Sequence, residues 1–270
     1  MQTVYQLILL FTIYSFVGWA CETAYCSIPA KRFINRGFLN GPFCPVYGFG
    51  ALLVIYPLEP LSDHIVLLFL CGMIITSLLE YLTAYILEVC FHTKWWDYSQ
   101  KKFNIHGRVC LKNSLLFGVM SVLLVKLLHP WVQWLLTLLP DWLVPLVSFF
   151  LLVYFVTDSV VTVRSILTLN GKMEKLQQAM QELKEKNQAL KTRMQQDLEA
   201  RLDAKLDEET KKRLENLSEH IHEMTENSRM WQRRLLEAFP HMSSERHAEA
   251  LEKMRQAVQE RREKRKRRKK

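Results

Sequence analysis

Residues 65–90 read IVLLFLCGMIITSLLEYLTAYILEVC. This stretch contains no basic residue and only two acids, Glu80 and Glu88. A helix that crosses the hydrocarbon core of a bilayer, about 30 Å thick, needs about 20 mainly apolar residues. The stretch therefore predicts a transmembrane helix that carries two carboxylates into the membrane or close to it.

Four further apolar stretches on either side have comparable composition, although Pro42, Pro45 and Gly50 crowd the start of the second one. The chain is therefore expected to be an all-α, polytopic integral membrane protein with about five transmembrane helices. The predicted spans cover roughly residues 4–26, 44–60, 65–90, 112–129 and 142–168.

Lysine and arginine residues lie in alternate gaps between these spans. Gap 28–43 holds three of them and gap 91–112 holds five, whereas gaps 57–64 and 130–141 hold none. Short loops rich in Lys and Arg face the cytoplasm. The pattern predicts an N-out, C-in topology, in which the long C-terminal tail is cytoplasmic.

The tail differs sharply in composition, because residues 171–270 hold 26 of the 36 Lys and Arg residues and 19 of the 27 acids. The pair Asn170-Gly171 is typical of a helix end. Beyond it, apolar residues recur in steps of three and four, with Asn187 at a position that fixes register in coiled coils. The residues of this seam are Met173, Leu176, Met180, Leu183, Asn187, Leu190 and Met194.

A second seam, from Leu214 to Leu235, is out of phase with the first, so the tail is either one interrupted coiled coil or two helices folded on each other. We expect self-association or a helical partner for it. The predicted domains are a transmembrane domain (1–170), a cytoplasmic coiled coil (171–238) and a short amphipathic helix with a polybasic end (239–270). The run RREKRKRRKK at 261–270 predicts attraction to anionic lipid, and a solvated tail is the alternative.

Four acids fall within or near the predicted spans, and an ionised carboxylate in lipid is costly unless it is paired or faces a polar cavity. Glu22 and Glu88 lie within about a turn of the predicted cytoplasmic ends, whereas Glu80 and Asp158 lie roughly 15 Å in from those ends at ~1.5 Å per residue. We predict that Glu80 and Asp158 line a shared polar cavity, with Arg108 or Arg164 as counter-charge. A structural network that joins helices is the alternative.

Two predicted cytoplasmic loops add polar candidates. The block NRGFLNGPFCPVYGFG, residues 35–50, has four glycines and two prolines, which favours either a re-entrant turn lining a cavity or an ordinary tight turn. The second loop combines aromatic, acidic and basic side chains at the membrane face. The candidates for a substrate-binding or structural polar site in these loops are Asn35, Arg36, Trp96, Asp97, Tyr98, Asn104 and Arg108.

Sequence signatures of several enzyme classes are missing: the chain has no GxxxxGK[ST], GxSxG or HExxH. The cysteines and histidines around the second loop, Cys90, His92, His106 and Cys110, have a spacing that fits no standard zinc site. We therefore predict no catalytic residues, no cofactor and no metal, and expect any ATP hydrolysis to come from a separate chain.

The same loops and acids carry a family resemblance over about residues 1–165. The matching stretches are Gly18-Trp19-x-x-Glu22, the block 35–50, Glu80-Tyr81 with Glu88, residues 95–99, Asn104, Gly107-Arg108 and Ser114. In these the chain resembles the bacterial ABC-transporter type IV (CmpB-like) permease family. The resemblance implies a permease-like transport subunit of the cytoplasmic membrane that works with a separate ATPase subunit. A membrane-anchored coiled-coil adaptor or scaffold is the alternative function.

Overall fold

The computed structural model describes residues 4–196, 212–213, 215–219, 221, 230–244 and 246–267. The chain divides into two compact units. The membrane unit contains the residues up to Ser165 together with Arg234–Ser243, and the tail unit contains the residues from Ile166 onward apart from that segment. Leu214 and Met224 of the predicted second seam and the last three residues of the basic run lie outside the described residues.

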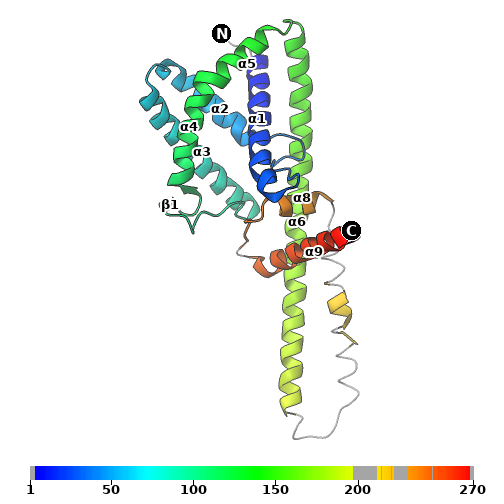
Figure 1. Cartoon of the computed structure of the whole chain (residues 1–270). Coiled ribbons are helices and arrows are strands. Elements are labelled where there is room, and N and C mark those ends of the chain that lie inside the picture. Colours follow the sequence, from blue (N-terminus) through cyan, green and yellow to red (C-terminus); the bar gives the residue numbers. More distant parts are fainter. Residues whose placement is uncertain are drawn as a thin grey trace. The chain divides into compact units, whose positions relative to one another are not determined.

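Helices make up most of the membrane unit (Figure 1). Among the described residues, four helical rods are long and apolar enough to cross a membrane: α1, α3, the rod Leu111–Thr137 and the first part of α6. The prediction of an all-α, polytopic membrane protein is thus confirmed. The elements are α1 (Val4–Ala30), α2 (Pro45–Leu58), the 3-10 turn η1 (Glu59–Leu61), α3 (Ile65–Phe91), α4 (Leu111–Leu123), the π-helical turn η2 (Leu124–Leu128), α5 (His129–Thr137) and α6 (Leu143–Gln196).

The second expected span, 44–60, is a shorter element than the other four. Helix α2 has 14 residues, which is roughly 21 Å at ~1.5 Å per residue and less than the ~30 Å of a hydrocarbon core. Pro45 occupies its first turn, where proline is tolerated, and Pro57 lies near its end. In the part of the chain that the structure describes, four helices therefore have spanning length where about five were expected.

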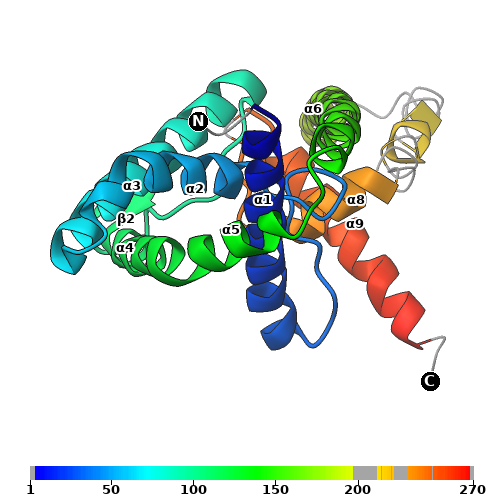
Figure 2. The same ribbon diagram turned by 90° about the horizontal axis from the view of Figure 1, so that it is seen from above.

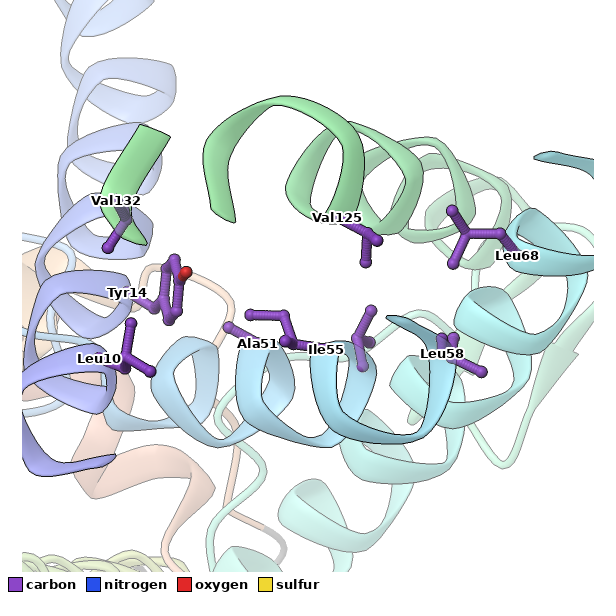
Figure 3. Close-up of a cluster of buried hydrophobic side chains, with 9 residues drawn as sticks. Leu10, Tyr14, Ala51, Ile55, Leu58, Leu68, Val125 and Val132 are labelled. Atoms are coloured by element: carbon purple, nitrogen blue, oxygen red, sulfur yellow. The ribbon is translucent and has the colours of Figure 1, made fainter. Parts of the chain in front are cut away.

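Helix α2 is nevertheless central to packing, because it lies between α1 and α3 (Figure 2). Leu10 and Tyr14 of α1 meet Ala51 and Ile55 of α2 in one buried cluster (Figure 3). The same cluster includes Leu58 of α2, Leu68 of α3, Val125 of η2 and Val132 of α5. This core fixes α2 against both neighbours.

Glycines let α1 and α2 approach closely. A Cβ on Gly18 would collide with the Tyr47 ring, and a Cβ on Gly48 would collide with the Ser15 hydroxyl. Small residues at such crossings permit backbone contact between membrane helices. This approach brings Tyr47 to the face of α1 that carries Glu22.

The loops that follow α1 and α3 lie at the same end of the membrane unit. The Phe38 and Trp95 rings, one from each loop, pack edge to face with centroids 5.3 Å apart. Asp63, in the turn after α2, instead forms an ion pair with Lys126 of η2 at 3.5 Å. The two basic loops therefore share one end, as alternate gaps of a polytopic protein must.

We expect this shared loop end to be cytoplasmic, because both loops are rich in Lys and Arg. In protein whose native cysteines are replaced, a membrane-impermeant thiol reagent applied to intact cells should label Ser62→Cys and spare Ser99→Cys. Permeabilised cells provide the control, in which both positions must react. Labelling of Ser99→Cys alone in intact cells would reverse the topology.

A small hairpin closes the second loop. Strands β1 (Asn104–Ile105) and β2 (Val109–Cys110) pair antiparallel around His106 and Gly107, both with positive φ, 53° and 69°. Positive φ at both central residues is the geometry of a type I′ turn, which glycine adopts readily. The hairpin brings Arg108 back toward α3.

The helix end expected at Asn170-Gly171 is wrong, because α6 continues through both residues to Gln196. Glycine inside a helix costs about 1 kcal/mol relative to alanine. Burial offsets this cost, since Leu169 and Met173 on either side are almost fully buried. Local composition suggested a stop, and packing on the apolar side of the helix overrides it.

Within the tail unit, α6 pairs with α9 (Ala248–Arg267). The Gln177 side chain accepts a hydrogen bond from the Ala250 backbone N–H at 3.1 Å, and Lys184 contacts Glu249. The buried apolar residues on the two helices are Leu169, Met173, Leu176, Ala250, Leu251 and Met254. Part of the first seam thus has a partner helix in its own chain, and self-association stays a prediction.

Candidate functional site

Each of the four predicted intramembrane acids has specific partners. Glu88 accepts hydrogen bonds from Arg108 Nε and Nη2 at 3.0 and 2.8 Å, and Lys94 Nζ lies 3.8 Å from its other oxygen. The Arg108 guanidinium also lies over the Tyr81 and Tyr85 rings. The hydrogen bond to Glu88 raises the pKa of Arg108. Arg108 is therefore the counter-charge of Glu88, and the predicted pairing with Glu80 or Asp158 is wrong.

Glu22 joins α1 to α2 and to the first loop. The Tyr47 hydroxyl donates to Glu22 Oε1 at 2.5 Å, and Arg36 Nε lies 3.7 Å from Oε2. The carboxylate is thus shared between a neutral donor and a cation. Both partners come from the 35–50 block.

Glu80 is the least satisfied of the four acids. Tyr98 Oη donates to Glu80 Oε1 at 3.3 Å, and the Asn113 side chain lies beside the carboxyl group. Glu80 Oε2 is buried and has no hydrogen-bond partner among the described residues. Burial, together with the charge of Glu80, raises the pKa of Tyr98.

Glu22 and Glu80 belong to one cluster. Glu22 lies within electrostatic range of Glu80 and of Tyr98, and both glutamates lie within electrostatic range of Tyr47. We call these four residues, Glu22, Tyr47, Glu80 and Tyr98, the two-glutamate cluster. It combines two carboxylates with two phenol hydroxyls from α1, α2, α3 and the second loop.

Asp158 has a separate set of partners. Its carboxylate accepts from the backbone N–H groups of Asn40 and Gly41 at 3.1 and 2.9 Å, and from the Thr162 hydroxyl at 3.4 Å. A Cβ on Gly41 would collide with the Tyr154 hydroxyl, so a larger residue there would have to displace the Tyr154 side chain. Irregular backbone at membrane depth persists where protein groups satisfy it. Asp158 does this for the first loop, and the contacts group Glu80 with Glu22 instead of Asp158.

Asn35 and Arg36 shape the first loop. Asn35 Oδ1 accepts from Trp19 Nε1 at 2.7 Å and from the Gly37 N–H at 3.1 Å, and its amide nitrogen donates to the Asn40 carbonyl. Arg36 points toward Glu22 and also donates to the carbonyl of Ala238. Asn35 thus holds the backbone, and Arg36 supplies charge to the acid cluster.

Among the second-loop candidates, three hold the loop and two face the acids. Trp96 Nε1 donates to the Arg108 carbonyl at 3.0 Å, and Asn104 donates to two carbonyls of the same loop. Asp97 accepts from the Ser99 N–H, and hydrogen bonds from Ser99 lower the pKa of Asp97. Tyr98 and Arg108 reach Glu80 and Glu88 respectively.

Tyr47, Asn113 and Arg234 take part in these contacts, although the sequence pattern did not mark them as site residues. Tyr47 lies in the block 35–50, which was already a candidate for a polar site, so the sequence did offer a signal for it. Arg234 had no such signal: it donates to the Gly37 and Phe38 carbonyls at 2.9 and 3.1 Å from almost 200 residues away. Within the described ranges, no three His, Cys, Asp or Glu side chains gather as metal ligands would.

Comparison with known proteins gives one family. The family model described as "Putative ABC-transporter type IV" matches residues 9–163, more than half of the chain and all four acids described above. No curated protein and no solved structure matches the chain. The matched region ends just before the membrane unit gives way to the tail unit within α6. The chain therefore belongs to this ABC-transporter type IV family of membrane proteins.

Proposed function

We propose that the protein is a permease-like subunit of a transport system in the bacterial cytoplasmic membrane, energised by a separate ATPase subunit. Membership of an ABC-transporter-type family supports a transport-related membrane protein. The chain itself has no nucleotide-binding loop of the GxxxxGK[ST] type. ATP hydrolysis therefore has to be supplied by a partner.

The observation that carries the proposal is the buried Glu80 Oε2, which has no hydrogen-bond partner among the described residues. A carboxylate inside a membrane protein is expensive, and acids kept there usually serve ion or substrate pathways. A purely structural acid would have both oxygens satisfied, as those of Asp158 are by backbone donors. Glu80 can accept a further donor or a cation, and Glu22 lies close enough to add its charge.

In this proposal the other candidates have supporting roles. Asp158 and Asn35 hold the first loop beside the two-glutamate cluster, and Arg36 balances the charge of Glu22. Glu88 and Arg108 fix the second loop so that Tyr98 reaches Glu80. The basic end at 261–270 adds attraction to anionic lipid.

The experiment that tests the proposal purifies the tagged full chain from native membranes in mild detergent and reconstitutes the complex in liposomes. We expect an ATPase subunit in the complex and ATP hydrolysis that requires this chain. The full chain is needed, because residues 234–243 pack on the membrane unit and would be lost on truncation at Gly171. A complex without any ATPase, in which residues 171–270 account for every partner bound, would favour the adaptor function instead.

A further inference from the structure

A short segment of the C-terminal region packs on the membrane unit although both of its flanks belong to the tail unit. Residues 234–243 cluster with the membrane unit, whereas residues up to 233 and from 244 onward cluster with the tail unit. The segment comprises the end of α8 (Met230–Ala238) and the five residues that follow it. Figure 1 shows α8 next to the loop that follows α1.

The segment binds the first loop through arginine side chains. An arginine of the segment donates to carbonyls of the loop, and an arginine of the loop donates to a carbonyl of the segment. Arg234 donates to Gly37 and Phe38, and Arg36 of the loop donates back to Ala238. Arg32 forms an ion pair with Glu237 at 3.1 Å. The segment thus contacts the same loop whose N–H groups bind Asp158.

The second loop provides an aromatic and a backbone contact. The Phe239 ring packs edge to face on Trp95, with centroids 4.9 Å apart. The Arg36 guanidinium lies over the Phe239 ring, 5.1 Å from its centroid. Lys94 and Ser243 exchange both backbone hydrogen bonds at 2.8 Å, as in an antiparallel ladder. Both loops at this end of the membrane unit are therefore tied to the segment.

The docked state also carries unsatisfied donors. Trp95 Nε1 and Arg234 Nε are buried without a hydrogen-bond partner among the described residues. Burying a donor without a partner is unfavourable, more so for a charged group. Burial also lowers the pKa of Arg234, the direction expected for a partly desolvated guanidinium. The free energy gained from the aromatic and carbonyl contacts is partly offset by the cost of these buried donors. A contact whose net free energy is reduced in this way can open.

We propose that residues 234–243 are a releasable latch, by which the tail controls the first loop and, through Arg36 and Asp158, the polar groups of the membrane unit. Release removes Arg234 from the Gly37 and Phe38 carbonyls and removes Ala238 and Phe239 from Arg36. Arg36, whose Nε lies 3.7 Å from Glu22 Oε2 in the docked state, is then free to move closer to that carboxylate. The docking of the latch is independent of the proposed transport function, and its effect on the two-glutamate cluster rests on that function.

The docking is tested by a disulfide in the full chain. Residues that exchange both hydrogen bonds in an antiparallel pair have Cα atoms about 5.5 Å apart, within the range that a disulfide spans. In protein whose native cysteines are replaced, Lys94→Cys with Ser243→Cys should cross-link within one chain on mild oxidation in membranes. Tryptic fragments joined only by the disulfide identify the product. The pair Lys126→Cys with Ser243→Cys is the control and should not cross-link.

Control of the loop is tested in protein that keeps native Cys44 as its only unpaired cysteine. Cys44 is suitable because it is buried at the end of the first loop and lies within electrostatic range of Arg234. Arg234→Ala should raise the rate of maleimide labelling at Cys44 at least about fivefold, the lower end of typical coupling between sites. Arg246→Ala, at an exposed arginine of the tail unit, is the matched control and should leave the rate unchanged. Locking the latch with the 94–243 disulfide should lower the rate.

Two results would overturn the latch. Absence of the 94–243 cross-link, or a cross-link formed only between two chains, would show that the segment does not dock on its own membrane unit. A Cys44 labelling rate unaffected by Arg234→Ala and by the disulfide lock would show that the segment docks without controlling the loop. Neither measurement uses ATP or a substrate, so the latch and the transport function can fail separately.

Discussion

Replacing Asp158 by alanine is expected to destabilise the membrane unit more than any other single change of an acid. The substitution leaves the backbone N–H groups of Asn40 and Gly41 without their acceptor. Each buried donor left unsatisfied costs about 1–3 kcal/mol, so the combined loss is roughly 2–6 kcal/mol. Thermal unfolding of the purified protein in detergent, followed by loss of the monodisperse fraction, should show a clearly lower midpoint.

Asp141→Ala is the matched control, because Asp141 is an exposed aspartate in the turn before α6. It should leave the midpoint unchanged. Asp158→Asn should fall between the two, since its amide keeps one acceptor oxygen for the loop. If Asp158→Ala unfolds at the wild-type temperature, Asp158 does not hold the first loop, and its role in the candidate site has to be reconsidered.

Replacing Glu80 by glutamine should, unlike Asp158→Ala, leave the stability of the membrane unit intact and abolish its function. Glutamine keeps the shape of the side chain and still accepts a hydrogen bond from Tyr98. It removes a buried charge that lies within electrostatic range of Glu22 and whose Oε2 has no partner in the described part of the chain. We expect unchanged or higher thermal stability, and a transport-coupled ATPase rate at least about tenfold lower, which corresponds to ~1.4 kcal/mol.

The control for this prediction is Glu59→Gln, the same substitution at an exposed glutamate in η1, at the opposite end of α2 from Tyr47. It should retain wild-type stability and rate. A Glu80→Gln protein that supports the wild-type rate would exclude Glu80 as the functional acid. A Glu80→Gln protein that fails to fold would make Glu80 a structural residue, like Asp158.

Much of the membrane unit could be predicted from the sequence, because insertion into a bilayer depends on the transfer free energy of consecutive residues. The long apolar helices around residues 65–90 and 142–168 follow from this. So does the identity of the acids, since a charge within an apolar run is visible without any structure. The shortness of α2 was visible only in part: Pro42, Pro45 and Gly50 marked its start as irregular, but its end depends on the turn into α3.

The pairing of the polar groups could not be predicted in the same way. Arg108 binds Glu88 because the β1–β2 hairpin turns it back toward α3, and hydropathy says nothing about that turn. Tyr47 reaches Glu22 because Gly18 and Gly48 let α1 and α2 approach closely, and the charge of Glu22 then lies within range of Glu80. Depth in the membrane, which suggested Glu80 and Asp158 as partners, does not specify which helix faces which.

The sequence by itself determined a multi-pass helical membrane protein, the residues that carry charge into it, and the alternation of basic and neutral gaps. Each of these is a property of consecutive residues and of their transfer between water and lipid. Only the tertiary structure decided that α6 continues through Gly171, that Asp158 holds the first loop, and that residues 234–243 dock on the membrane unit. These features depend on contacts between residues far apart in the chain, where packing and hydrogen bonding override the local preferences of each segment.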